Sequence, residues 1–283
     1  MRTRRKGWSR GAAGAIAAAV LLFVSPILGY AILVSPHAVF MDHRTRSGQV
    51  YLANTGTTPE EVEIALTYGY PVTDSAGNIS VRLIERPDST EPSAAGWIRA
   101  FPRRAVVQPG ERQVVRLLAQ PPATLPDGEY WSRLIITARG QQMAVASSDT
   151  TVRAGVSLEM RTVISVSYRK GQVRTGVEIR DLRASVEHDS LIVWVGLVRQ
   201  GNAAYLGTTR IRLFDAANAV HGDWTTPTAV YVPVTRRYAF ALEGAAPGRY
   251  VVSVDLSTAR EDLPQRDILP ANPAHSSVVV EVR

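Results

Sequence analysis

Histidines are the residues of this chain most suited to hold a metal or to move a proton near neutral pH. The chain of 283 residues has five of them and no cysteine: His37, His43, His188, His221 and His275. No two are spaced like a metal-binding pair on a helix. The segment Met41–Asp42–His43 offers possible ligands, but a solvated loop explains it better. We therefore expect no metal site and no cofactor.

Acidic and aromatic residues give no better indication of catalysis. Asp181, Glu187 and Asp189 are close in sequence, but a solvated face explains them better than the paired carboxylates of a glycosidase. The sequence has no nucleophile elbow, phosphate loop or dinucleotide fingerprint. We expect the later tryptophans to fill cores or line edges rather than to stack on sugars, with Trp224 the one suited to an exposed loop: Trp97, Trp131, Trp194 and Trp224. We predict a protein without enzymatic activity.

Most of the positive charge lies at the N-terminus. Residues 1–31 supply +5 of the formal net charge of +7 and contain no acid, so the remainder carries only +2. That value is too weak for a phosphate-binding surface, and we expect no nucleic-acid partner. The basic start MRTRRKGWSR precedes the apolar GAAGAIAAAVLLFVSPILGYA, and this order predicts a secretory signal peptide over residues 1–31.

An uncleaved membrane anchor is the alternative for this segment. No charged residue falls between Gly11 and Pro36, a stretch long enough to match the ~20 apolar residues of a membrane span. Pro26 and the small residues Gly29 and Ala31 favour cleavage instead. We expect an exported, periplasmic chain that keeps no stable membrane span after cleavage.

The rest of the chain consists of short alternating runs separated by turn residues. In the first half, EEVEIALTYGY places Val62, Ile64 and Leu66 on one face, DSAGN predicts a turn, and VVQPGERQVVRLLA predicts a hairpin-like unit with Pro109–Gly110 at its tip. After Lys170 about seven more short strands follow. With no convincing amphipathic helix, the pattern predicts two antiparallel β-sandwiches, and the short boundary near Lys170 predicts a fixed angle between them.

One predicted strand is unusually long. Period-2 alternation runs from Val156 to Tyr168, and its apolar face holds Val, Leu, Met, Thr, Ile, Val and Tyr. Such a strand would be roughly 43 Å long at about 3.3 Å per residue, about twice the common length. A domain of ordinary size does not easily cover all of that face, so something else must cover its first half.

The first domain resembles the PapD-like periplasmic chaperones of fimbrial chaperone–usher systems. The matching pieces occur in the family's order and span about half the chain: SPHAVFMDH (35–43), GQVYLANTG (48–56), AFPRRAVVQPGERQVVRLLA (100–119), LPDGEYWSRLIITA (125–138) and VSLEMRTVISVSYR (156–169). The resemblance implies an all-β chain of two immunoglobulin-like sandwiches, an N-terminal PapD-like domain over 32–170 and a C-terminal β-sandwich over 171–283. The second domain matches only in size and place.

The family binds its subunits by donor-strand complementation, in which the chaperone lends its long strand to an incomplete pilin sandwich. Carried over by position, the donor residues would be Val156, Leu158 and Met160, while Ile164, Val166 and Tyr168 would stay in the chaperone's own core. The alternative is that all thirteen residues pack within the monomer. An exposed apolar edge strand is prone to aggregation and needs protection in the free chaperone. One hypothesis is that the QQMAVASSD stretch (141–149), just before the strand, folds over it or pairs loosely with another copy.

Two further family features bear on the site. The family anchors the subunit's C-terminal carboxylate with two basic residues, and here their positions hold His37 and Ser165, with Arg161 on the same face of the strand as a possible source of charge. His37 as an ordinary strand residue is an equal alternative. An ion pair also fixes the family's domains, and Glu129 and Arg169 occupy two of its positions. Two solvated charges would be the alternative, and Asp255 or Asp262 are guesses for a third partner.

The resemblance thus implies a chaperone that binds a secreted pilin-like subunit and passes it to an outer-membrane usher. The second hypothesis is an exported immunoglobulin-like envelope protein that binds another surface protein without an usher. The loss of the basic anchors favours this alternative. An enzyme, such as a glycan-active sandwich, would need two close acids facing a cleft.

Overall fold

The computed structural model describes residues 32–140, 158–242 and 245–282. Alternating apolar residues form strands throughout, because one buried face per strand suits a sandwich. The first sandwich holds ten strands: β1 (Ile32–Ser35), β2 (Ala38–Asp42), β3 (Ser47–Asn54), β4 (Glu60–Thr73), β5 (Ile79–Ile84), β6 (Ile98–Phe101), β7 (Arg104–Val107), β8 (Arg112–Ala119), β9 (Gly128–Gly140) and β10 (Glu159–Lys170).

The strands of the first domain form two facing sheets. One has the order β1-β3-β8-β6, and the other has the order β2-β10-β9-β4-β5, with β7 paired to the start of β4. The β2–β10 pair is parallel, and the other pairs are antiparallel. Inward-facing residues of both sheets, such as Val50, Leu117 and Leu134, share one core and are fully buried.

Seven strands and one 3₁₀ turn make up the second domain. They are β11 (Thr175–Glu187), β12 (Ser190–Gly201), β13 (Tyr205–Phe214), β14 (Val220–Val230), β15 (Val234–Ala241), β16 (Gly248–Ser257), η1 (Gln265–Asp267) and β17 (Ala274–Val282). Their sheets have the orders β11-β12-β15 and β14-β13-β16-β17, and both pack on a separate core. The prediction of two β-sandwiches is confirmed.

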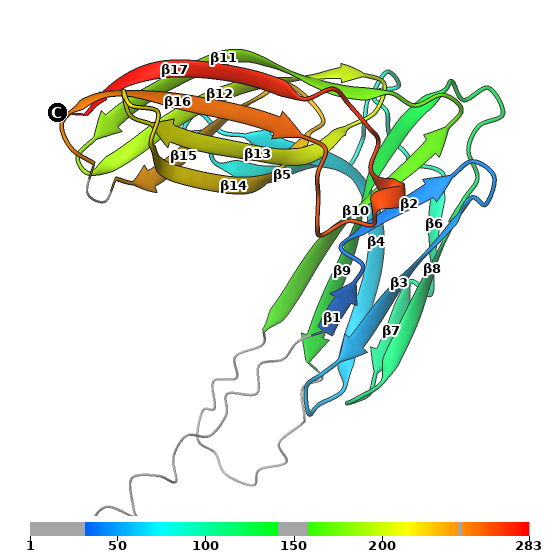
Figure 1. Cartoon of the computed structure of the whole chain (residues 1–283). Coiled ribbons are helices and arrows are strands. Elements are labelled where there is room, and N and C mark those ends of the chain that lie inside the picture. Colours follow the sequence, from blue (N-terminus) through cyan, green and yellow to red (C-terminus); the bar gives the residue numbers. More distant parts are fainter. Residues whose placement is uncertain (1–31, 141–157, 243–244, 283) are drawn as a thin grey trace, which may run out of the picture.

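Figure 1 shows the two sandwiches meeting at one end, so that the molecule is bent and has a concave side. A third apolar cluster lies at this junction. It joins Tyr68, Tyr70 and Trp131 of the first domain to Ala204 and Tyr231 of the second. Because side chains of both domains are buried in this one cluster, the junction is a packed interface rather than a loose tether.

Two details of the predicted strands are corrected. The VVQPGERQVVRLLA segment is not a hairpin, because β7 pairs with β4 in one sheet and β8 pairs with β3 and β6 in the other. Alternation alone does not reveal that the Pro109–Gly110 turn crosses between sheets. The long strand, expected over 156–168, is β10 at Glu159–Lys170. Its start at Val156 and the QQMAVASSD stretch lie outside the described residues.

Candidate functional site: a free strand edge and an interdomain cleft

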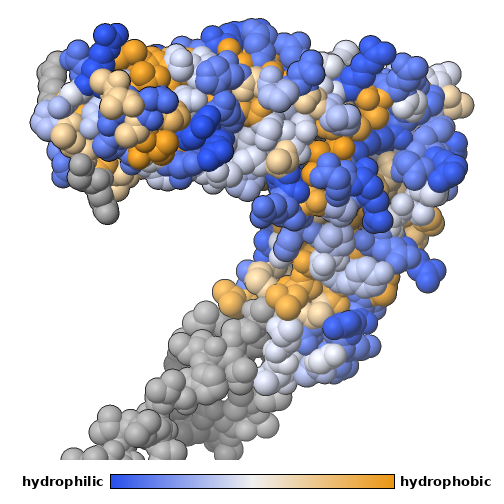
Figure 2. Space-filling view, viewed as in Figure 1, coloured by the Kyte–Doolittle hydropathy of each residue, from blue (hydrophilic) through white to orange (hydrophobic). Residues whose placement is uncertain are grey.

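Burial along β10 changes sharply from one end to the other. Ile164, Val166 and Tyr168 lie in the core and are at most 2% exposed. Met160, on the same face, is only half-buried, and Leu158, just before the strand, is 61% exposed. Figure 2 shows hydrophobic residues at the surface where β10 begins in Figure 1. The first half of the apolar face is therefore open among the described residues.

One edge of β10 is also open at that end. The strand pairs with β9 along its whole length, from Glu159 to Lys170. On its other side it pairs with β2, but only from Ser165 to Arg169. Within the described part of the chain, residues 159–164 thus have backbone groups on one side without a strand partner. An open edge with apolar side chains is a template for pairing with another strand.

A ladder of ion pairs holds the start of β10 to its sheet. The Arg139 guanidinium lies 2.7 Å from a carboxylate oxygen of Glu159 and 3.7 Å from one of Glu63, and Glu63 also lies 3.1 Å from Arg104. These pairs run from β10 across β9 and β4 to β7. Each exposed pair contributes little alone, because solvent screens its charges. Together they orient the strand end that carries the open edge.

A cleft of about 260 Å³ lies beside the other end of β10, between the two domains. The first domain contributes His37 and Ser165 to its lining, and the second contributes Tyr231. The backbone N–H of Ser165 donates to the His37 carbonyl at 3.4 Å. Two of the three predicted anchor residues therefore line one cavity. The third, Arg161, is exposed and is not part of this lining.

Arg133 is the cation of this cleft that sequence reasoning missed. It lies on β9 directly opposite Ser165, lines the cleft and is only 7% exposed. Its Nε donates to the Gly69 carbonyl at 3.1 Å, and its guanidinium lies 5.1 Å from the centre of the Tyr231 ring. Among the described residues it has no ion-pair partner. A buried cation without an acid favours an anion nearby.

The second cleft arginine, Arg260, is already neutralised. Its Nε lies 2.6 Å from Asp262, and its second guanidinium nitrogen contacts the other carboxylate oxygen. This bidentate interaction is the main reason why the pKa of Asp262 lies below its usual value. Arg133 and Arg260 thus face the same cavity in different electrostatic states, and of the two only Arg260 has an acid partner among the described residues.

Glu129 and Arg169 form a buried ion pair at the domain junction. Arg169 Nε donates to Glu129 Oε2 at 2.7 Å, and the Glu129 side chain is fully buried. Glu129 Oε1 accepts from Trp131 Nε1 at 2.8 Å and from the backbone N–H of Ala204 at 3.2 Å. A second Arg169 nitrogen donates to the Asp267 carbonyl at 2.7 Å. The partners in the second domain are thus backbone groups.

The guessed third partners lie elsewhere. Asp255 binds Arg212 and His275, and Asp262 binds Arg260. Sequence reasoning looked for an acidic side chain in the second domain, whereas Arg169 uses a carbonyl oxygen there. Backbone acceptors leave no pattern in the residue types, so this partner could not be predicted.

The other candidates for chemistry have structural partners. Asp42 accepts from the backbone N–H groups of Arg44 and Thr45, both at 2.8 Å, and so forms a turn. Asp181 pairs with Arg183, and Trp224 stacks on Phe240 at 4.2 Å. In the described ranges no three His, Asp or Glu side chains gather as metal ligands do. Those ranges also contain no helix of the length and hydropathy needed to cross a membrane.

Comparisons with known proteins find similar folds only among solved structures. No family model matches the chain, and no curated protein matches it. One similar structure is the complex of a chaperone with a tip adhesion subunit from the archaic chaperone–usher Csu pili of Acinetobacter baumannii. It has 19% identity and a TM-score of 0.42, over 74% of this chain and 90% of the other.

Two further similar structures contain a chaperone alone. The YadV chaperone has 14% identity and a TM-score of 0.44, over 87% of this chain and 99% of its own. The CupB2 chaperone of Pseudomonas aeruginosa has 12% identity and a TM-score of 0.41, over 87% and 98%. All three structures contain chaperones.

Proposed function

We propose that this protein is a periplasmic assembly chaperone that binds a secreted pilin-like subunit by lending it the first half of β10. The observation that carries this proposal is that, within the described residues, the strand edge at 159–164 is unpaired and the apolar side chains beside it lie outside the core. Backbone groups on such an edge supply affinity, and alternate side chains supply specificity.

The size of the open face is consistent with tight but reversible binding. Each fully buried Leu or Met side chain contributes roughly 1.5–3 kcal/mol. Leu158 and Met160, with Val156 before them, would contribute several kcal/mol together, before the costs of ordering and association are subtracted. Ile164, Val166 and Tyr168 are already buried, so binding would not require the core to open.

Within this proposal the cleft would receive an anion of the subunit, such as its terminal carboxylate. His37 and Ser165, at the positions that the family resemblance implies, would donate hydrogen bonds there. Arg133 would supply the charge, since it is the cleft arginine without an acid partner. Arg161 is not part of the cleft lining, so it would act on the part of the subunit that lies along the strand.

Delivery to an outer-membrane usher would need a second surface, and the outer face of the β1-β3-β8-β6 sheet offers one. Its exposed apolar residues are Leu33, Tyr51, Phe101 and Leu118. Arg99, Arg112 and Arg116 lie exposed among them, and no outward-facing residue of these four strands is acidic. Aromatic residues and arginines dominate the energetics of protein interfaces, so this face suits an acidic partner.

On this proposal the chain is exported by the segment 1–31 and acts without catalysis, cofactor or nucleic acid. Binding and release would use only strand pairing and the burial of apolar surface. These are equilibria that need no chemical step. The alternative, an envelope protein that binds a surface protein without an usher, is favoured by one observation: neither His37 nor Ser165 carries a permanent charge.

The experiment is co-purification from the host's cell envelope with three forms of the chain. The parent should bring down a small secreted β-protein in a one-to-one complex. A Leu158→Asp, Met160→Asp double variant should lose it, because two carboxylates would enter an apolar groove. Val220→Asp is the matched control, since Val220 is 57% exposed but lies on the second domain. Equal recovery of the partner protein with all three forms would refute strand donation. Recovery of the partner from a host that has no usher would favour the alternative, an envelope protein that binds a surface protein.

A further inference from the structure

The β4–β5 hairpin extends well beyond the sheet to which it belongs. β4 pairs with β9 only as far as Thr67, and from Tyr68 to Thr73 it pairs with β5. Six further residues at about 3.3 Å each carry the hairpin roughly 20 Å past the last β9 pair. Figure 1 shows β5, in cyan, running along the second domain.

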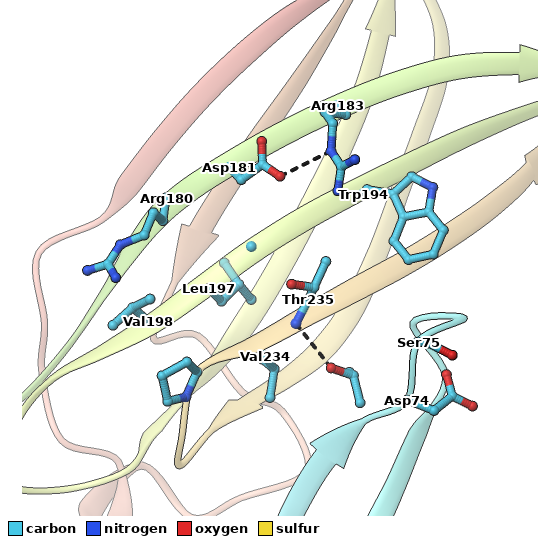
Figure 3. Close-up of a pocket in the computed structure, with 13 residues that line it drawn as sticks. Asp74, Ser75, Arg180, Asp181, Arg183, Trp194, Leu197, Val198, Val234 and Thr235 are labelled. Atoms are coloured by element: carbon cyan, nitrogen blue, oxygen red, sulfur yellow. Dashed lines mark hydrogen bonds and ion pairs between the residues drawn. The ribbon is translucent and has the colours of Figure 1, made fainter.

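The tip of the hairpin, residues 74–78, contacts the β15 edge of the second domain. The backbone N–H of Arg237 donates to the Gly77 carbonyl at 3.3 Å. The backbone N–H of Thr235 donates to Thr73 Oγ1 at 3.1 Å. Figure 3 shows Asp74 and Ser75 of the hairpin facing Thr235 and Trp194 across a groove of about 860 Å³. β15 is an edge strand of its sheet, so the hairpin occupies its unpaired side.

Gly77 is required by this contact as well as by the turn. Its φ is +77°, a conformation that L side chains rarely adopt. A Cβ at this position would lie 2.5 Å from Arg237 Cβ, 2.6 Å from Arg237 N and 2.8 Å from Trp194 Cζ3. Since one of these atoms is backbone, a side chain at 77 would push the hairpin away from β15.

Besides the buried aromatic cluster at the junction, polar attachments between the domains lie near the end of β10. Arg169 binds the Asp267 carbonyl, and Asn202 Nδ2 donates to the Asp127 carbonyl. These contacts and the aromatic cluster hold the domains together near the chain connection, so a contact far from it is best placed to oppose rotation about that point. The hairpin tip reaches the second domain through a separate arm and therefore opposes such rotation.

We propose that the β4–β5 hairpin is an interdomain brace, and that Gly77 is a positioning residue that sets the angle between the two sandwiches. The brace also fixes the cleft, since Pro71 and Val81 on the hairpin stems line it together with Leu206 and Ala229 of the second domain. A role of this brace in subunit capture rests on the proposed function. The angle between the two sandwiches does not depend on the proposed function, so it can be measured on the free chain.

The absence of native cysteine makes the angle directly measurable. Spin labels at Ser47→Cys and Ser277→Cys, exposed residues of the first and second domains, report one interdomain distance by double electron–electron resonance. The variant is Gly77→Ala. The matched control is Gly110→Ala, because Gly110 has a φ of +75° but no atom within 4 Å of its Cβ position. Both substitutions strain a turn, but only Gly77→Ala obstructs the contact between the hairpin tip and β15.

The parent and Gly110→Ala should give one narrow distance distribution, and Gly77→Ala should shift it or at least double its width. A second variant replaces residues 74–78 by Asn-Gly, which keeps a two-residue hairpin but removes the tip. It should broaden the distribution in the same way even if Gly77→Ala fails to fold. Distributions that superimpose on the parent's, or equal broadening by Gly110→Ala, would overturn the brace while leaving strand donation untouched.

Discussion

Arg169 and Glu129 are joined by a 2.7 Å bond in which the carboxylate is fully buried and the guanidinium nearly so. Each partner also reaches a backbone group of the second domain, at Asp267 and Ala204 respectively. The pair is therefore part of the junction rather than a surface contact. Its two charges are tolerated in this position because they pair with each other and are also hydrogen-bonded to neighbouring groups.

Removal of one charge should cost more than removal of both. We expect Arg169→Met to lower the free energy of unfolding by about 3–5 kcal/mol, because Glu129 would remain buried without its cation. The Glu129→Gln, Arg169→Met double variant should recover most of that loss. Urea unfolding of the parent, both single variants and the double variant measures the coupling. A double variant that loses as much as the sum of the single ones would show that the pair is not coupled.

Substitutions along β10 should separate binding from folding. Leu158→Asp should change stability by less than about 0.5 kcal/mol, since the side chain is exposed in the free chain. Ile164→Asp, six residues further on the same face, should lower stability by more than about 4 kcal/mol or prevent folding, because it places a carboxyl group in the core. Thermal unfolding followed by circular dichroism tests both. A large loss with Leu158→Asp would place the start of the strand in the monomer's own core.

The two cleft arginines should respond differently to loss of charge. Arg133→Met should weaken subunit binding by about ten- to a hundredfold, as expected for one hydrogen bond between charged groups at about 1.5–3 kcal/mol. Arg260→Met should weaken it less than threefold, because Asp262 already balances that charge. Calorimetric titration with the co-purified subunit gives both affinities. If Arg260→Met proves the more damaging change, the anion is held by the second domain and not by Arg133.

A buried acid at the start of β4 should make stability depend on pH. Burial raises the pKa of Glu60, whose Oε1 atom is buried without a hydrogen-bond partner. Between the unfolded and the folded pKa the native state binds more protons, so this group lowers stability as pH rises through that window. Glu60→Gln should therefore stabilise the fold at pH 7, because it removes the buried charge, and the gain should shrink as pH falls and Glu60 becomes protonated.

Urea unfolding at pH 7 and at pH 4 measures the gain for Glu60→Gln. The matched control is Glu61→Gln, because Glu61 is the next residue and is exposed. Its free energy of unfolding should stay within about 0.5 kcal/mol of the parent's at both pH values. A gain that is the same at both pH values would mean that Glu60 does not titrate in this range.

Alternation was sufficient to predict the architecture. Residues such as Val62 and Ile64 are buried as their period indicates, and the seven strands of the second domain are present. Alternation was not sufficient to assign strands to sheets. β7 and β8 look like a hairpin in sequence, but β7 pairs with β4 and β8 pairs with β3. Whether a tight turn joins two strands of one sheet or crosses between two sheets depends on packing with such distant strands.

The site was only partly predictable for a similar reason. The excess apolar length before Ile164 indicated an uncovered strand, because that needs only local periodicity. Arg133 was missed, although a charged residue between Trp131 and the run LIITA was a visible exception to a buried pattern. Its position opposite Ser165 and against Tyr231 depends on register and on the second domain. The hairpin contact at Gly77 likewise depends on residues far apart in sequence.

Strand donation is tested most directly by hydrogen exchange on a complex isolated from the host's own cell envelope. Native mass spectrometry first establishes whether the chain carries one small secreted β-protein. Our account predicts a one-to-one complex in which the backbone amides of residues 159–164 that point away from β9 exchange at least tenfold more slowly than in the free chain, while β17 is unchanged. Equal exchange of those amides in the complex and in the free chain would contradict it.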